Sequence, residues 1–167
     1  MGCLGVHFAL THGEVVKLKS FATDVERREH LTDEIEETYF GEHEDLKAES
    51  DKAWDGMHRT LTDGRFAYDN GQYPLSHVVM GGEVVYGESD YIMVLKSPAQ
   101  VKDVARAIHA LTEAEFKARY RMIDQRNCDW PLSDEDCNYT WDWFQGVRDL
   151  FQRAADEDRY VLFTASQ

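Results

Sequence analysis

The segment "DKAWDGMHRTLTDG", residues 51–64, holds the residue types from which a catalytic or ligand-binding site is readily built. On a helix Asp55 and His58 lie about one turn apart, so the carboxylate could orient the imidazole as a general base or ligand. Trp54 would then form a wall of the pocket. No second histidine follows His58 at the four-residue spacing of a helical zinc motif, so the segment alone predicts no metal site.

The same spacing is also typical of an ordinary core helix. Trp54, Met57 and Leu61 recur at three- and four-residue steps and would form one apolar stripe, with Asp51 as the N-cap. His58 would then lie at the edge of the core, with one ring nitrogen bonded to a carbonyl or carboxylate. Because a histidine among apolar residues is more often structural than catalytic, we expect a core helix and keep a site as the alternative.

A second segment, "PLSHVVMGGE" at residues 74–83, also contains reactive residue types. Ser76 and His77 are adjacent, so their side chains point in different directions and form no nucleophile pair. Gly81 and Gly82 lack the strand–GxGxxG–helix context of a phosphate-binding loop and predict a turn. If the two segments frame one cleft, the candidate site residues are Trp54, Asp55, His58, His77, Gly81, Gly82 and Glu83, with no cofactor and no metal.

The aromatic cluster "NYTWDWF" at residues 138–144 is a third candidate. Trp141 and Trp143 are two residues apart on a predicted helix and face different directions, so at least one meets another element or the surface. An exposed tryptophan would mark a binding patch. The apolar stripe predicted for this helix consists of Trp143, Val147, Leu150 and Ala154.

The elements that must position these residues follow from hydrophobic periodicity and capping signals. Strands are predicted at residues 3–10, 91–95 and 159–166. Helices are predicted from Thr11 to Leu18, over 24–39, 51–61 and 98–111, from Thr112 onward, and over 139–155. Strands at both ends and in the middle, separated by helices, predict a helix-rich three-layer α/β/α domain with a small mixed sheet. Residues 1–167 form a single domain in this prediction.

Composition narrows the classes of partner. With 32 acidic and 18 basic residues the net charge is −14, which argues against binding to nucleic acid or to a membrane surface. The same field favours a basic protein partner and leaves the oligomeric state open. The sequence predicts no secretory signal and no membrane span. Its three cysteines, including Cys128 and Cys137, match no zinc spacing and predict free thiols in a reducing cytoplasm.

Taken together, five segments resemble the YfbM-like family, a group of small bacterial proteins with a domain of unknown function. The segments are "MGCLG", "DKAWDGMHRTLTDG", "YPLSHVVMGGE", "SPAQVKDVARAIHALTEAEF" and "YTWDWFQGVRDLFQRAADEDRYVLF", in the same order along the chain. The resemblance implies a three-layer α/β/α fold and supplies no reaction. Its distinctive positions are Trp54, Asp55, His58, Pro74, Leu75, Gly81 and Gly82. Arg59 and Thr60 depart from the apolar residues common after the histidine, so these positions are not expected to line a shared hydrophobic pocket.

Two hypotheses of function remain. The first is a non-enzymatic, cytoplasmic interaction protein, because acidic charge and abundant tryptophan and tyrosine suit protein recognition. A specific version is an antidote-like protein that masks a basic toxin or nuclease. The second is a small-molecule-binding protein or hydrolytic enzyme with a cleft framed by residues 54–58 and 74–83, in which Asp55 orients His58 and the second segment adds a polar group.

Overall fold

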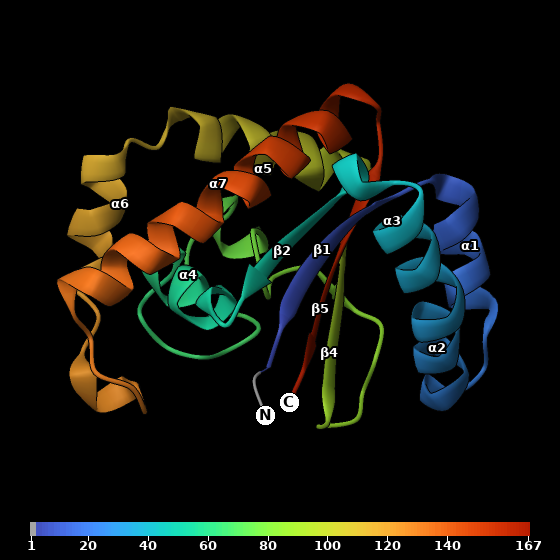
Figure 1. Cartoon of the computed structure of the whole chain (residues 1–167), viewed down its shortest axis with the longest axis horizontal. Coiled ribbons are helices and arrows are strands. Elements are labelled where there is room, and N and C mark those ends of the chain that lie inside the picture. The colour runs from blue at the N-terminus through green and yellow to red at the C-terminus, as the bar shows by residue number, and fades with distance from the viewer. Residues whose placement is uncertain (1–2) are drawn as a thin grey trace.

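The computed structural model describes residues 3–167 and is built on a five-stranded open sheet (Figure 1). The strands have the spatial order β2-β1-β5-β4-β3. Their bounds are β1 Gly5–Leu10, β2 Lys47–Asp51, β3 Glu83–Val84, β4 Tyr91–Lys96 and β5 Tyr160–Ser166. The first and last strands are therefore neighbours, and the two ends of the described chain lie close together (Figure 1).

Helices cover both faces of the sheet, which confirms the predicted helix-rich α/β class. One face carries α1 (His12–Ser20), α2 (Asp24–His30), a π-helical turn (Leu31–Glu36) and α3 (Glu37–Gly41). The other carries α4 (Ala53–Leu61), α5 (Pro98–Ala110), α6 (Glu113–Tyr120) and α7 (Asp134–Asp156) (Figure 1). Short 3-10 turns lie at Glu44–Leu46, Leu75–His77 and Gln125–Asn127.

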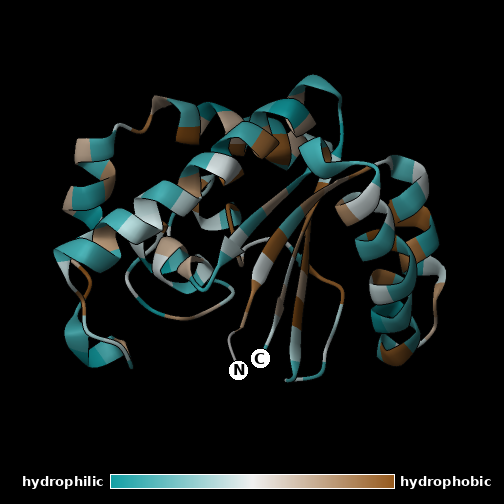
Figure 2. Ribbon diagram, in the orientation of Figure 1, coloured by the Kyte–Doolittle hydropathy of each residue, from teal (hydrophilic) through white to brown (hydrophobic). Residues whose placement is uncertain are grey.

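Burial on both faces explains why the central strands read as continuous apolar runs. On β1, Phe8 packs against Tyr39 of α3, whereas the alternate residue His7 packs against Phe151 of α7. Figure 2 shows the hydrophobic residues concentrated on these strands and the hydrophilic residues on the surrounding helices. The sheet is thus the middle layer of the molecule.

The sheet differs from the mixed one that the sequence predicts, because every pairing is antiparallel. A single crossover helix brings a strand back parallel to the one before it. Here three helices separate β4 from β5, and α1, α2 and α3 separate β1 from β2, so the chain returns in the opposite direction. Hydrophobic patterning locates strands but does not contain this directional information.

The edge strand β2 was not predicted, since its sequence "KAESD" is polar. In the sheet Ala48 and Ser50 face the core while Glu49 faces solvent. This alternation is typical of an edge strand with one solvent-exposed face. Asp51 ends this strand with a positive φ of 47°, and α4 begins only at Ala53. The predicted N-cap role of Asp51 is therefore wrong.

Two fully buried basic groups lie on the sheet face beneath α4–α7. His7 donates from Nε2 to the Val78 carbonyl (2.8 Å), and Lys96 donates to the Val79 carbonyl with its nitrogen 5.5 Å from the centre of the Phe163 ring. Lys96 forms no ion pair within residues 3–167. Burial lowers the pKa of Lys96 well below its usual range, and burial together with Lys96 lowers the pKa of His7 to about 3.

Stability should therefore rise with pH in the alkaline range. The unfolded chain protonates Lys96 below about pH 10 whereas the folded chain keeps it neutral, so unfolding takes up a proton. The free energy of unfolding in urea should increase as pH rises from the folded pKa of Lys96 toward about 10, with a limiting slope of about 1.4 kcal/mol per pH unit from this group. Lys96→Met should flatten that slope, whereas Lys102→Met on the surface should leave it unchanged. Equal slopes in all three proteins would contradict a neutral buried lysine.

Candidate functional site

His58 lies on α4 with only 1% of its surface exposed. Its Nε2 is 2.8 Å from the Ala67 carbonyl oxygen and 2.9 Å from Asn70 Oδ1. Both neighbours are acceptors, so Nε2 carries the proton and donates to each. Burial lowers the pKa of His58, which keeps the ring neutral. His58 thus fastens the loop that follows α4, the contact expected for a structural histidine.

Asn70 completes this attachment of the loop. Its amide nitrogen donates to Thr62 Oγ1 (3.2 Å), Asp63 Oδ1 (2.5 Å) and the Arg65 carbonyl (2.9 Å), which leaves its oxygen for His58. Gly71 follows with a φ of 83°, and a Cβ there would stand 2.7 Å from Thr62. The loop from residue 62 to residue 71 is therefore held to α4 by buried and partly buried hydrogen bonds.

The other predicted site residues are dispersed. Asp55 bonds Arg59 instead of His58, with 2.7 Å between Oδ1 and Nε. The Ser76 hydroxyl lies 2.9 Å from His77 Nδ1, so the prediction that these adjacent side chains point in different directions is wrong. Glu83 pairs with Lys19 (2.8 Å) at the edge of the sheet. The structure therefore does not bring His58, His77 and Glu83 together in one cleft.

Gly81 and Gly82 form the turn into β3, as the sequence predicts. Gly82 has a φ of 131°, and a Cβ at this position would stand 2.5 Å from the Leu95 carbonyl oxygen. The close approach to strand β4 therefore requires glycine here.

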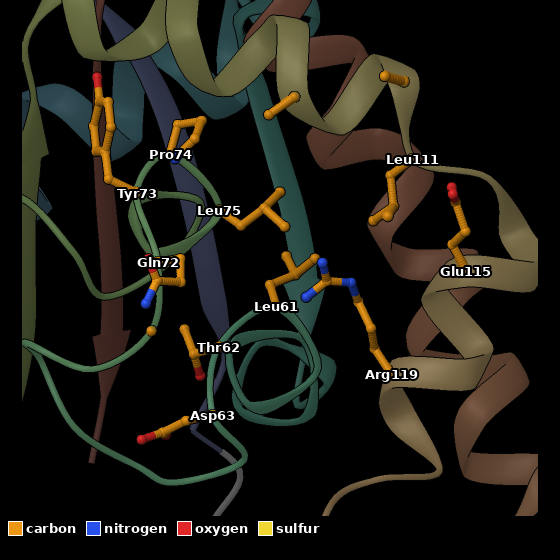
Figure 3. A pocket seen from close by; sticks show the side chains of 13 residues that line it. Leu61, Thr62, Asp63, Gln72, Tyr73, Pro74, Leu75, Leu111, Glu115 and Arg119 are labelled. Carbon is orange, nitrogen blue, oxygen red and sulfur yellow. The ribbon is translucent and has the colours of Figure 1, made fainter.

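A pocket lies beside the two predicted segments, but none of residues 54–58 lines it (Figure 3). Leu61, Thr62 and Asp63 come from the end of the first segment, and Pro74 and Leu75 from the second. This loop pocket has a volume of about 590 Å³ and is closed by α5, α6 and the turn between them. In Figure 3 Arg119 of α6 extends from the opposite wall toward the side chain of Leu61.

A second and larger pocket, of about 780 Å³, lies at the other end of α4. Four aromatic side chains line it, and we call it the aromatic pocket: Trp54, Phe66, Trp130 and Tyr139. Its remaining lining residues are Cys3, Lys52, Asp55, Arg59, Asp129, Asp136 and Gln167. The Trp54 and Phe66 ring centres are 5.9 Å apart, and Trp54 Nε1 donates to the Cys3 carbonyl (2.7 Å). Of the seven predicted site residues, only Trp54 and Asp55 belong to this pocket.

Arg59 forms part of the wall of the aromatic pocket although its side chain is only 8% exposed. Besides Asp55, it bonds the carbonyls of Gly64 (3.3 Å) and Asn127 (2.6 Å) through Nη1. Its guanidinium carbon lies 5.4 Å from the centre of the Trp130 ring. Arg59 thus lines a pocket of mixed aromatic and charged residues, whereas Thr60 is not among its lining residues.

Hydrogen bonds hold the other aromatic walls in place. Trp130 Nε1 donates to Asp136 Oδ2 (3.0 Å), and Tyr120 donates to the same oxygen. Tyr139 donates to Asp51 Oδ2 (2.5 Å), which ties α7 to the end of β2. Three of the four aromatic walls, Trp54, Trp130 and Tyr139, are therefore oriented by hydrogen bonds within the chain.

Trp143 borders this region on the outside of α7. It is 36% exposed and packs edge-on against Tyr139, whereas Trp141 packs against Phe116 and Phe144. The predicted place of Trp143 in the buried stripe is wrong, because this residue is exposed although it lies on the same side of the helix as Leu150 and Ala154. The buried apolar residues of α7 are Cys137, Phe144, Val147, Leu150, Phe151 and Ala154.

A row of carboxylates follows Trp143 along the solvent face of α7. Glu135, Asp142, Asp149 and Asp156 are all exposed and recur every seven residues, which places them on one side of the helix. None of the four forms an ion pair with the residues that the structure describes. We call these four residues with Trp143 and Tyr139 the α7 face.

The remaining candidates show no reactive geometry. Cys3, Cys128 and Cys137 are free, as predicted, and burial raises the thiol pKa of Cys128 and Cys137. In residues 3–167 no cluster of three or more histidine, cysteine or acidic residues could hold a metal ion. Over the same range no helix is long and apolar enough to cross a membrane.

Removal of the His58 contact should release the loop. In His58→Leu the Ala67 carbonyl and the Asn70 oxygen lose their donor, which should cost about 2 kcal/mol or more of stability. Trypsin should then cleave after the exposed Arg65 several-fold faster, as followed by mass spectrometry. His109→Leu, at an exposed position of α5, is the matched control. Equal cleavage of both variants and the wild type would show that His58 does not hold the loop.

Comparison with known proteins places the chain in a family. The sequence profile of the family described as "Domain of unknown function (DUF1877)" matches residues 1–164. The crystal structure of YfbM from Escherichia coli, a protein of unknown function, is similar in fold with a TM-score of 0.67 and 18% sequence identity. The match covers 97% of this chain and 99% of the YfbM chain. A search of curated proteins found no relative. In agreement with the YfbM-like resemblance of its sequence, the chain belongs to the DUF1877 family.

Proposed function

We propose that this chain is a non-enzymatic protein-interaction domain that binds a basic protein partner through the α7 face. The observation that supports the proposal is the exposed Trp143 beside four carboxylates that form no ion pair with the described residues. Aromatic anchors with a charged rim are the usual composition of a recognition surface.

Electrostatics favour a basic partner over other classes. Carboxylates seven residues apart on a helix are about 10 Å apart, close to the Debye length at physiological salt, so their fields add along the row. The net charge of −14 extends the same sign over the whole molecule. Such a surface accelerates encounter with a basic protein and repels phosphate backbones.

The candidate acid–base groups support a non-enzymatic reading. His58 is neutral and holds a loop, and Asp55 pairs with Arg59. His77 and Glu83 lie in separate contacts away from both. In the specific form of the proposal, the chain is an antidote-like protein that covers the basic site of a toxin or nuclease in the cytoplasm. Three free thiols agree with that reducing compartment.

The test compares two charge reversals of equal size. Asp142→Lys/Asp149→Lys changes the α7 face, and Asp33→Lys/Glu37→Lys changes exposed residues on the opposite side of the sheet. Affinity capture from native lysate at moderate salt should yield one near-stoichiometric basic protein with the wild type and the control. The α7 variant and Trp143→Ala should retain at least tenfold less, about 1.4 kcal/mol.

Three outcomes would contradict the proposal. The α7 variant could retain the partner as the wild type does, or both reversals could lose it equally, in which case net charge alone is responsible. Absence of any saturable partner from the native lysate would also reject an interaction domain.

A further inference from the structure

The aromatic pocket contains an unused hydrogen-bond donor on a buried cation. Arg59 is more than nine-tenths buried, yet its Nη2 forms no hydrogen bond with residues 3–167, while Nε and Nη1 are both engaged. The fully buried side-chain atoms without a hydrogen-bond partner do not include Arg59 Nη2. This atom is therefore accessible to solvent. Because Arg59 lines the aromatic pocket, its free N–H groups are available to a ligand there.

Lys52 adds a second positive group to the same lining. It is exposed and forms no ion pair with the described residues. The acid that neutralises Arg59, Asp55, uses one oxygen for that contact. The lining of the pocket therefore includes two positive groups that could donate to an anionic group such as a carboxylate.

Carboxylates of the pocket are also available. Asp129 is exposed and has no cationic partner among residues 3–167, and Asp136 uses only Oδ2 for Trp130 and Tyr120. A simple anion would meet these acids and the net charge of −14, whereas a simple cation would meet Lys52 and Arg59. A ligand that carries both charges satisfies both sets of groups.

The aromatic walls indicate the rest of the ligand. Trp54, Phe66, Trp130 and Tyr139 present apolar ring surface around a volume of about 780 Å³. That volume lies within the roughly 300–1,000 Å³ of small-molecule sites. Phe66 belongs to the loop that His58 fastens, so the wall is preformed and loses little entropy on binding.

From this arrangement we infer that the aromatic pocket binds a free α-amino acid with an aromatic or large apolar side chain. Its carboxylate would bond Arg59 Nη2 and Lys52, its ammonium group would face Asp129 and Asp136, and its side chain would lie between the aromatic walls. This site adjoins the α7 face and shares Tyr139 with it, but ligand binding needs no protein partner, so the purified chain suffices to test it.

Isothermal titration of the purified chain with L-phenylalanine, L-tryptophan, L-tyrosine and L-leucine tests the inference. At least one should bind saturably at sub-millimolar to millimolar concentration. For L-phenylalanine, 3-phenylpropionate lacks the ammonium group and phenethylamine lacks the carboxylate. Each analogue should bind about tenfold more weakly than the zwitterion, a loss of about 1.4 kcal/mol.

Variants locate the site. Lys52→Met and Asp129→Asn are exposed changes that leave the fold intact, and each should weaken binding about tenfold. Arg59→Met should abolish binding but also removes contacts to Gly64 and Asn127, so it is interpreted only if its circular dichroism is native. Arg119→Met, in the loop pocket, is the control and should bind as the wild type does.

The inference is overturned by any of three results. No amino acid of the panel binds saturably at millimolar concentration, or an analogue without one charge binds as tightly as the zwitterion. The third such result is that Lys52→Met and Asp129→Asn bind the amino acid as tightly as the wild type does. None of these results bears on the α7 face, because the residues changed there lie outside this pocket.

Discussion

The shape of the region around α4 depends on one buried proton, the Nε2 hydrogen of His58. This hydrogen is shared between the Ala67 carbonyl and Asn70 Oδ1. The Asn70 amide nitrogen in turn donates to Thr62, Asp63 and Arg65. A loop of this length without secondary structure would otherwise be mobile. Instead it supplies walls to two pockets, at opposite ends of α4.

Helix α7 connects the core to the surface that we assign to recognition. Its inner face packs on the sheet and on α5, which fixes the direction of every outward side chain. Tyr139 links the two sides, because its hydroxyl bonds Asp51 at the end of β2 while its ring supports Trp143. The aromatic pocket and the α7 face thus adjoin on a rigid scaffold, as binding sites require.

Local signals in the sequence were sufficient for much of the fold. The capping boxes at Thr11 and Thr112 and the Ser97 cap are observed, since each depends on residues only three positions apart. The three apolar strands were predicted correctly because each is a short continuous run of apolar residues. Strand direction and the polar strand β2 were missed, because they depend on how distant segments pair rather than on hydropathy.

The candidate site was predicted less completely. Spacing identified Trp54 and Asp55 and placed His58 on a helix, but it could not show that Asp55 faces Arg59. Trp130 and Phe66 come from loops without periodicity, so no pattern connects them to α4. Trp143 was assigned to the buried stripe because it shares a helix side with Leu150 and Ala154, but periodicity does not show whether another element covers that position. Which side chains meet in the site depends on contacts between segments that are distant in the sequence, and local spacing does not contain that information.

The central claim is that the residue most suggestive of chemistry, His58, is a structural donor and that recognition occurs beside it. Nitrogen-15 NMR of the imidazole between pH 8 and pH 5 tests this most directly, because burial lowers the pKa of His58. We expect the neutral ring to be the Nε2–H tautomer, and its titration midpoint to lie below the ordinary histidine value. Titration near the ordinary histidine pKa of about 6.5, or an Nδ1–H tautomer, would contradict the account.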